Sequence, residues 1–155
     1  SCLVGSEMCI RDRFQGVKRR MEILASCEDY VIYDDFAHHP TEIFKTLSSL
    51  REKIGNDQII ALIEPRSRTM QSGLHDKEMA KALSPADSVI WYEGQDVKRS
   101  MSAELKKAKA EVYFAANISE IIQITRQIKT TKSNIVIMSN GDFSGLRELI
   151  KKELD

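Results

Sequence analysis

Short apolar runs and stretches with helical spacing alternate along the chain from residue 14 onward. Two apolar segments, at 21–25 and 30–33, are separated by four mostly polar residues, which predicts a hairpin whose first strand lies at the edge of a sheet. Further strands are predicted where the apolar runs are short and continuous, namely at 58–63, 88–92, 111–114 and 134–138. Helices are predicted at 40–54, 72–83 and 101–109, after Asn117, and after Gly141.

Single residues indicate where the helices begin and which faces they bury. Pro40 is expected to open the first helix, where its missing N–H has no partner to lose. Asn117 is expected to cap a later helix together with Glu120. The first helix is expected to bury one apolar face, made of Ile43, Phe44, Leu47, Leu50 and Ile54. The last helix is expected to bury Leu146, Leu149, Ile150 and Leu154.

The alternation of strands and helices predicts an α/β fold. We expect a Rossmann-like, mostly parallel sheet of about six strands, with an antiparallel edge strand and helices on both faces. In such sheets ligands collect at the carboxyl ends of the strands. Three polar segments, at 34–40, 64–70 and 139–145, fall at predicted strand ends. The sequence therefore predicts a site at that edge of the sheet.

The first thirteen residues differ from the rest, because they show neither alternation nor helical spacing. They are similar to a translated sequencing adapter, so we interpret 1–13 as a non-native segment and 14–155 as one domain. Without that segment Cys27 is the single cysteine. A lone thiol is typical of a reducing compartment, which predicts a cytoplasmic protein.

The charge balance narrows the class of partner. The 155 residues include 23 Lys+Arg and 23 Asp+Glu, so the formal net charge is zero, which argues against a strongly basic nucleic-acid binder. No apolar run approaches the roughly 20 residues of a membrane span. The sequence also lacks Gly-x-x-x-x-Gly-Lys-[Ser/Thr] and Gly-x-Gly-x-x-Gly, the usual phosphate-binding loops. We expect neither a nucleic-acid nor a membrane partner.

The densest polar motif is Asp-Asp-Phe-Ala-His-His-Pro at 34–40. Its two carboxylates and two imidazoles are compatible with a metal site. They are also compatible with a nucleotide site, in which an Asp holds the ribose and a helix N-terminus faces phosphate. The third interpretation is a capped helix with a solvated His pair. No further ligand cluster supports a metal, so no metal-binding residue is assigned.

Three other segments leave similar alternatives open. The arginines at 18–22 suit phosphate because their planar forks donate several hydrogen bonds, but they also suit an exposed edge strand. Arg66 and Ser67 either hold an anionic group or belong to an ordinary polar loop. Asn140 and Gly141 form a turn that brings backbone N–H groups near a ligand or simply joins a strand to a helix. His75 is expected at the surface.

Together these motifs resemble a known family. Phe-Gln-Gly-Val-Lys-Arg-Arg-Met-Glu at 14–22 and Asp-Asp-Phe-Ala-His-His-Pro-Thr at 34–41 are similar to the start of the C-terminal domain of the Mur ligases, the ATP-dependent amide ligases of peptidoglycan synthesis. The segments at 64–70 and 138–145 are similar to Glu-Pro-Arg-Ser-x-Thr-Met and Met-Ser-Asn-Gly-x-Phe-x-Gly of the murein peptide ligase branch, which serves recycling. The L-alanine-adding branch usually carries Gln-Pro-His-Arg instead.

The resemblance implies a reaction and its substrates. ATP phosphorylates the carboxylate of UDP-N-acetylmuramate, and the amine of L-alanyl-γ-D-glutamyl-meso-diaminopimelate then attacks the acyl phosphate. Catalysis rests on positioning and on stabilising the phosphoryl charge. The phosphate loop and most Mg²⁺ contacts belong to N-terminal and central domains that this sequence does not include, so the fragment alone is expected to be inactive.

The resemblance also implies roles for particular residues. Arg20 matches an arginine that contacts the nucleotide phosphates, and Asp35 matches an aspartate that contacts the ribose. The expected catalytic residues are Arg20, Asp35 and His38, and ATP binding adds His39. The expected peptide-binding residues are Arg66, Ser67, Asn140 and Gly141. The loop at 93–100 is expected to contact the distal diaminopimelate.

Two departures and three alternatives accompany this interpretation. Arg68 stands where the branch has Asn, and Asp142 stands where it has Gly, so the contacts of both loops need a structure. The first alternative is the C-terminal domain of a UDP-N-acetylmuramate–L-alanine ligase. The second is a free-standing nucleotide-binding α/β module without catalysis. The third is a metal hydrolase that uses His38 and His39.

Overall fold

A computed structural model describes residues 19–66, 68–95 and 100–154. Six strands form one sheet in the order β1-β2-β6-β3-β4-β5. Only β1 and β2 pair antiparallel, and the other neighbours are parallel. The strands are β1 (Glu22–Ser26), β2 (Tyr30–Asp35), β3 (Gln58–Ile63), β4 (Ser88–Tyr92), β5 (Glu111–Ala115) and β6 (Ser133–Met138). The predicted fold class is confirmed, whereas the segment 1–13 lies outside the described residues.

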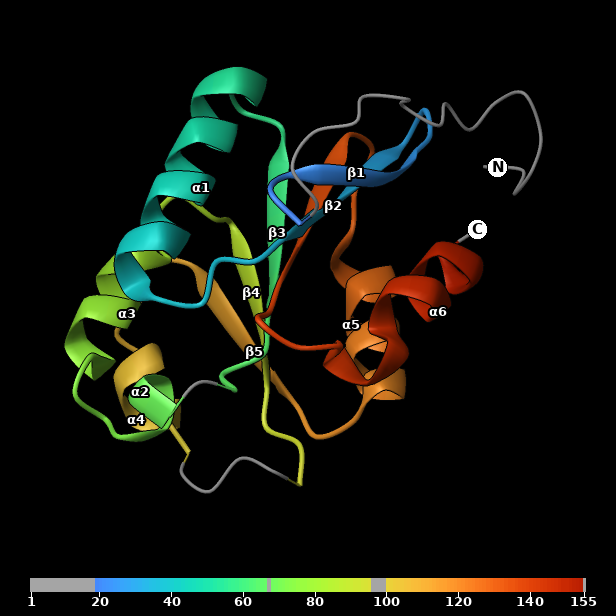
Figure 1. Cartoon of the computed structure of the whole chain (residues 1–155). Coiled ribbons are helices and arrows are strands. Elements are labelled where there is room, and N and C mark those ends of the chain that lie inside the picture. The colour runs from blue at the N-terminus through green and yellow to red at the C-terminus, as the bar shows by residue number, and fades with distance from the viewer. Residues whose placement is uncertain (1–18, 67, 96–99, 155) are drawn as a thin grey trace.

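Helices cover both faces of the sheet (Figure 1). One layer contains α1 (Pro40–Ile54), α2 (Arg68–Gln71), α3 (Asp76–Ala82) and α4 (Ser102–Leu105), whose buried side chains share one core cluster. The opposite layer contains α5 (Ile118–Ile128) and α6 (Leu146–Glu153), and a 3₁₀ turn at Phe143–Gly145 leads into α6. A sheet covered on both sides explains why its inner strands are continuous apolar runs.

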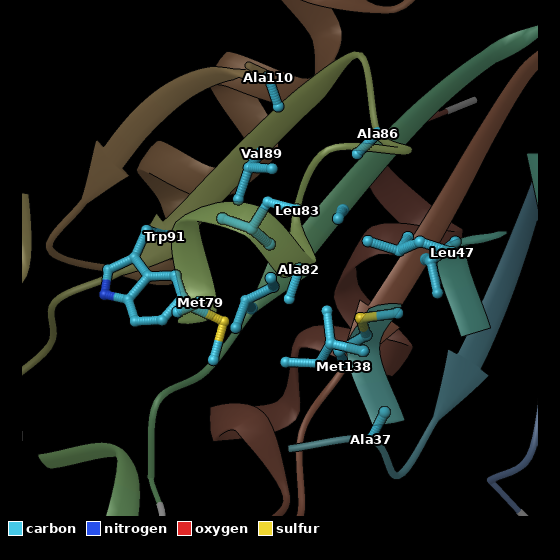
Figure 2. Close-up of a cluster of buried hydrophobic side chains, with 14 of the residues drawn as sticks. Ala37, Leu47, Met79, Ala82, Leu83, Ala86, Val89, Trp91, Ala110 and Met138 are labelled. Atoms are coloured by element: carbon cyan, nitrogen blue, oxygen red, sulfur yellow. The ribbon is translucent and has the colours of Figure 1, made fainter. Parts of the chain in front are cut away.

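The centre of the sheet is β6, which lies between β2 and β3. Every residue of β6 is buried, because helices pack on both of its faces. On the α1 side, Met79, Ala82 and Leu83 point toward Val89 and Trp91 of β4 (Figure 2). Because β6 pairs in parallel with β2 and with β3, the carboxyl ends of these three strands lie side by side.

Two predicted helices are shorter than expected. The helix predicted at 72–83 is confined to α3, because Gly73 has a φ of 78°, which no helix continues through, and α2 ends before the predicted range begins. The helix predicted at 101–109 is confined to α4. Both corrections concern the segments that follow β3 and β4, where turn residues interrupt a weak helical pattern.

Two side chains predicted to be buried are exposed. Phe44 is 45% exposed and Leu149 is 42% exposed. Phe44 follows the buried Ile43, and Leu149 precedes the buried Ile150. A step of one residue rotates a side chain by about 100° around the helix, which turns both away from the sheet. The apolar stripe of each helix is therefore narrower than the sequence pattern predicted.

Helix starts follow the predictions more closely. Pro40 begins α1, and the side chain of His39 caps it by accepting the N–H of Thr41 at 3.3 Å. Asn117 caps α5 by accepting the N–H of Glu120 at 2.9 Å. The carboxylate of Glu120 reaches back to the Ala116 N–H rather than to that of Asn117.

Two predictions drawn from composition have different outcomes. Cys27 is disulfide-bonded rather than a free thiol, so this cysteine gives no support to the prediction of a reducing compartment. Within the described residues, none of the helices has the length and apolar character that crossing a membrane requires.

Candidate functional site

The three polar segments meet at the carboxyl edge of the sheet. In the parallel register Asp35 of β2 and Ile63 of β3 both pair with Met138 of β6. The Ser139 N–H donates to the Asp35 carbonyl at 3.2 Å, and the Glu64 N–H donates to the Met138 carbonyl at 3.1 Å. The loops after β2, β3 and β6 are thus joined by main-chain hydrogen bonds at the point where each strand ends.

Asp35 ties three elements together. Its carboxylate accepts the N–H of Met21 at 3.0 Å, the N–H of Ala37 at 2.9 Å and the hydroxyl of Thr46 at 3.4 Å. The side chain is buried, and this desolvation raises the pKa of Asp35, although the hydrogen bonds to its charged form oppose the rise. Asp35 therefore fixes the turn before β1 and the loop before α1 in one arrangement.

A groove of about 620 Å³ opens beside Asp35, between β1 and α1. Met21 and Thr46, which both bond to Asp35, line it. Arg20 is exposed and lines it too, with Lys45 and Lys53 from α1. Ligand pockets typically measure about 300–1,000 Å³, and these three cations suit an anionic ligand. Arg20 thus lines the groove itself, whereas Asp35 lies behind it and bonds to two of the lining residues.

The histidines at 38 and 39 point to different neighbours. His38 donates from Nδ1 to the Phe36 carbonyl at 3.1 Å, and that nitrogen lies 3.6 Å from the Glu42 carboxylate. The ring of His39 faces the ring of His75, with centroids 4.8 Å apart. His75 was expected at the surface, but it is about one-fifth exposed and pairs with Glu78.

This divergence bears on the metal interpretation. Among the described residues, no group of three or more His, Cys, Asp or Glu side chains is arranged to hold a metal ion. The His38 ring contacts the Phe36 carbonyl in its own loop, whereas the His39 ring contacts His75 at the start of α3. The carboxyl edge therefore offers cations, hydrogen-bond donors and three buried carboxylates, those of Asp34, Asp35 and Glu64.

The second part of the site is the turn after β6. Arg66 is exposed and packs on Gly141 so closely that a Cβ at position 141 would lie 2.6 Å from its Nη1. The Gly141 N–H donates to the Ser139 hydroxyl at 2.9 Å, and that hydroxyl donates to the buried Glu64 carboxylate. Asn140 has a buried Oδ1 without a hydrogen-bond partner among the described residues. Arg66, Asn140 and Gly141 are thus brought together, as their positions at strand ends predicted.

The remaining predicted positions are only partly described. Ser67 lies outside the described residues. In the loop at 93–100, residues 96–99 also lie outside them, and Glu93 accepts a hydrogen bond from Ser100 at 2.7 Å. Asp142, one of the two departures, accepts the N–H of Gly145 at 3.2 Å and caps the turn into α6. Arg68, the other departure, is exposed at the start of α2.

Sequence reasoning missed the ion network beneath the turn. Asp34 is almost fully buried and bonds to Arg147 of α6 at 2.8 Å, with Arg19 at 3.6 Å on its other oxygen. Arg19 also donates to the carbonyls of Ser139 and Gly141. Strand alternation could have indicated Asp34, because neighbours on a strand point to opposite faces. Nothing in the local sequence indicates Arg147.

Comparison with known proteins identifies the family. A family model described as Mur ligase, glutamate ligase domain, matches residues 19–141. The chain belongs to this Mur ligase family. The match contains the candidate nucleotide groove and ends at the turn after β6, so both parts of the site lie in the family domain. The resemblance read from the four sequence motifs is confirmed.

Three relatives show how the Mur ligase domain compares. The UDP-N-acetylmuramate–L-alanyl-γ-D-glutamyl-meso-2,6-diaminoheptandioate ligase of Haemophilus influenzae is 34% identical over 142 residues, covering 91% of this chain and 31% of that protein. The UDP-N-acetylmuramate–L-alanine ligase of Streptococcus agalactiae is 50% identical over 136 residues, covering 84% of this chain and 30% of that protein. The crystal structure of a murein peptide ligase from Psychrobacter arcticus matches with a TM-score of 0.80 and 33% identity, covering 92% of this chain and 31% of that one.

The chain spans about a third of the length of these Mur ligases, since the covered shares are 31% and 30%. The two curated relatives differ in the amine that their names specify, a tripeptide in one and L-alanine in the other. The domain is therefore shown by comparison, while the amine that this chain serves has to be argued from its loops.

Proposed function

We propose that the chain is the C-terminal part of an ATP-dependent ligase that joins L-alanyl-γ-D-glutamyl-meso-diaminopimelate to UDP-N-acetylmuramate. Membership of the Mur ligase family supports the reaction class. The Glu-Pro-Arg-Ser segment at 64–67 supports the tripeptide, because it is similar to the murein peptide ligase branch. The relative from Haemophilus influenzae, which is named for this tripeptide, supports the same choice.

The nucleotide side of the proposal uses the groove between β1 and α1. Arg20 and Lys45 line the groove and supply positive charge for phosphates. Asp35, whose carboxylate accepts the Met21 N–H, is the residue that we propose for the ribose. His38 and His39 lie at the start of α1, where a helix N-terminus favours negative charge. ATP supplies the phosphoryl group that activates the muramate carboxylate, and Mg²⁺ is held mainly by parts of the ligase outside this chain.

The observation that carries the proposal is the meeting of two loops at one edge. Arg66 of the β3 loop lies against Gly141 of the β6 turn, and Asn140 lies in that same turn. The main chain of β2 joins the β6 turn to Asp35. An amine held by Arg66, Ser67, Asn140 and Gly141 would therefore lie beside the nucleotide loop, which is the arrangement that attack on an acyl phosphate requires.

A second candidate is a ligase that adds L-alanine. The relative from Streptococcus agalactiae favours it, because that L-alanine ligase shares 50% identity with this chain. The segment at 64–67 argues against an L-alanine ligase, because the L-alanine branch usually carries Gln-Pro-His-Arg in place of Glu-Pro-Arg-Ser. A free-standing nucleotide-binding module is the third candidate, since the described residues form one six-stranded sheet.

The test joins residues 14–155 to the N-terminal and central domains of the Haemophilus influenzae ligase. The chimera receives ATP, Mg²⁺, UDP-N-acetylmuramate and either the tripeptide or L-alanine, and mass spectrometry identifies the product. We expect the tripeptide amide together with ADP. A product that carries L-alanine alone would move the assignment to the second candidate.

Two further measurements separate the third candidate. We expect no amide product from the isolated chain and only weak ATP binding by calorimetry. Micromolar or tighter ATP binding by the isolated chain, with no product from the chimera, would contradict the ligase and favour the free-standing module. Because the proposed reaction consumes ATP and a nucleotide-linked sugar, we propose that the ligase works in the cytoplasm as part of peptidoglycan recycling.

A further inference from the structure

We propose that Arg19 is a positioning residue that sets the turn at 139–142 for the incoming amine substrate, while its main chain holds the nucleotide loop. The inference rests on the proposed function and assigns a role to the arginine that precedes Arg20. Three observations carry it: the contacts of the side chain, the contacts of the main chain, and the atoms that the turn leaves unpaired.

The side chain of Arg19 spans the turn. Its Nη2 donates to the Gly141 carbonyl at 2.8 Å and to the Ser139 carbonyl. On the other side, Nη1 of Arg147 donates to the Gly141 carbonyl at 3.2 Å and to the Asp142 carbonyl at 2.8 Å. Two guanidinium groups therefore hold three carbonyls of one turn and share the one at Gly141.

Asp34 holds both guanidinium groups in place. Its side chain is 3% exposed, and its two oxygens face Nε of Arg147 at 2.8 Å and Nε of Arg19 at 3.6 Å. A buried carboxylate between two arginines keeps both guanidinium groups close to it, because each charge would be costly to bury without the others. Asp34 lies on β2, so the turn after β6 is fixed relative to the strand that also carries the candidate nucleotide loop.

The main chain of Arg19 makes a separate set of contacts. Its carbonyl accepts the N–H of Phe36 at 2.7 Å, and its own N–H donates to the Glu22 carboxylate at 3.1 Å. Its φ is 59°, a left-handed conformation that a residue other than glycine adopts only when its surroundings enforce it. Its guanidinium also lies 5.0 Å from the ring centroid of Phe36. Arg19 thus contacts both loops of the site: its guanidinium reaches the turn and the Phe36 ring, and its main chain bonds to Phe36.

The hydrogen bonding of this network is incomplete. Among the described residues, three of its buried atoms lack a hydrogen-bond partner, namely Nε of Arg19, Oδ1 of Asn140 and Nη2 of Arg147. Of these, Nε of Arg19 faces the Asp34 carboxylate at 3.6 Å, so Asn140 and Arg147 carry the unpaired atoms that no charge faces. Buried polar atoms are normally paired, so atoms left unpaired around a turn indicate where a ligand or water completes the set. Removing the Arg19 side chain takes two hydrogen bonds from the turn and leaves only those of Arg147. The hydrogen bond from the Phe36 N–H to the Arg19 carbonyl remains. The amine side is therefore disturbed more than the nucleotide side.

The experiment measures KM for each substrate in the chimera described above. Arg19→Met keeps the length of the side chain and removes the fork, and it should raise KM for the amine substrate about tenfold or more, since small misplacements are costly in catalysis. KM for ATP should change less than about twofold, because the main-chain contact persists. Arg19→Lys should give an intermediate KM, since an ammonium cannot hold two carbonyls with the same geometry.

Arg51→Met is the matched control. Arg51 donates to the carbonyls of Gly55, Asp57 and Pro85 and to the Asp87 carboxylate, so it has as many contacts as Arg19 but lies far from the turn. It should lower Tm and leave both KM values unchanged.

Equal increases in KM for ATP and for the amine in Arg19→Met, or no increase in either, would overturn the proposal. If Arg19→Met does not fold, an unchanged amine KM in Arg19→Lys would overturn it instead. A wild-type chimera that makes no amide would refute the proposed function and this inference together, whereas an active chimera isolates the inference.

Discussion

Two arginine networks lie at opposite ends of the strands, one around Arg51 and one around Arg19 and Arg147. Their contacts are similar, but their burial differs. At the amino edge, Arg51 joins the end of α1 to the start of β4, donating to Gly55 at 2.8 Å, Asp57 at 2.7 Å and Asp87 at 2.6 Å. The Asp87 side chain is 50% exposed. An exposed pair of this kind contributes little beyond holding local loops together.

At the carboxyl edge the same chemistry is buried and incomplete. Asp34 is 3% exposed, and it holds Arg19 and Arg147 against the turn after β6. Among the described residues, Arg19 and Arg147 each have a buried nitrogen without a hydrogen-bond partner. In contrast, the side-chain nitrogens of Arg51 all donate hydrogen bonds. The two networks therefore differ in burial and in unpaired polar atoms rather than in the number of their hydrogen bonds. These two differences support the proposal that the carboxyl edge binds a ligand.

The largest test of this contrast replaces one carboxylate at each edge. Asp35→Ala in the chimera should lower kcat/KM about 100-fold or more, because the N–H groups of Met21 and Ala37 lose their shared acceptor and both loops shift. Asp87→Ala should leave kcat/KM within about threefold and affect stability alone. Initial rates of ADP release measure both. Similar losses in the two variants would remove the distinction between the edges.

A smaller effect is expected from adding one methyl group at each edge. Gly141→Ala places a Cβ 2.6 Å from Nη1 and 2.9 Å from Cδ of Arg66, so the arginine must move. We expect kcat/KM for the amine substrate to fall about tenfold, with little change in Tm, because a flexible side chain gives way.

Gly55→Ala is the counterpart at the amino edge. Gly55 has a φ of 66° and no atom within 4 Å of the added Cβ, so the strain is in the backbone and should destabilise the fold by about 1–2 kcal/mol. Urea unfolding and the same rate assay separate the two outcomes. A loss of activity in Gly55→Ala without loss of stability would contradict the comparison.

The smallest expected effect is a pH dependence centred on Asp35. Burial raises its pKa in the folded state, so the folded protein binds this proton more tightly than the unfolded chain does. Its contribution to stability is therefore complete below the unfolded pKa of about 4 and is lost as the pH rises through the higher, folded pKa. Carboxyl ¹³C NMR gives the midpoint, and urea unfolding at several pH values gives the slope. Asp35→Ala should abolish that slope, and a midpoint at or below the ordinary value would contradict the burial argument.

Much of the fold could be predicted, because its information is local. Continuous apolar runs indicate buried strands, and Pro40 and Asn117 begin helices as expected. The break at Gly73 was missed because the helical pattern around it is weak and the φ of a glycine is not visible in a sequence. The exposures of Phe44 and Leu149 were missed because one position on a helix separates a buried face from a solvated one.

The site was predicted less completely, because its contacts are between distant segments. Strand ends could be placed together, which is why Asp35, Arg66 and Gly141 meet as expected. The partners of Asp34 come from residues that are more than 100 positions away along the chain or that precede β1. Ring contacts such as that of His39 with His75 likewise depend on how α1 and α3 pack. These contacts follow from tertiary packing, which local patterns do not contain.

The place of β6 has a consequence for how a cell makes this protein. The strand is the last to be translated, yet it occupies the middle of the sheet. While the ribosome adds the roughly 100 residues between β2 and β6, which takes about 5–20 s, the β1–β2 hairpin and the β3–β4–β5 unit each present an open edge. Such edges invite pairing with other chains. The sheet closes, and the loops of the candidate site become neighbours, only when residues 133–138 have left the exit tunnel, so a nascent chain cut short before them would carry two unfinished halves and no site.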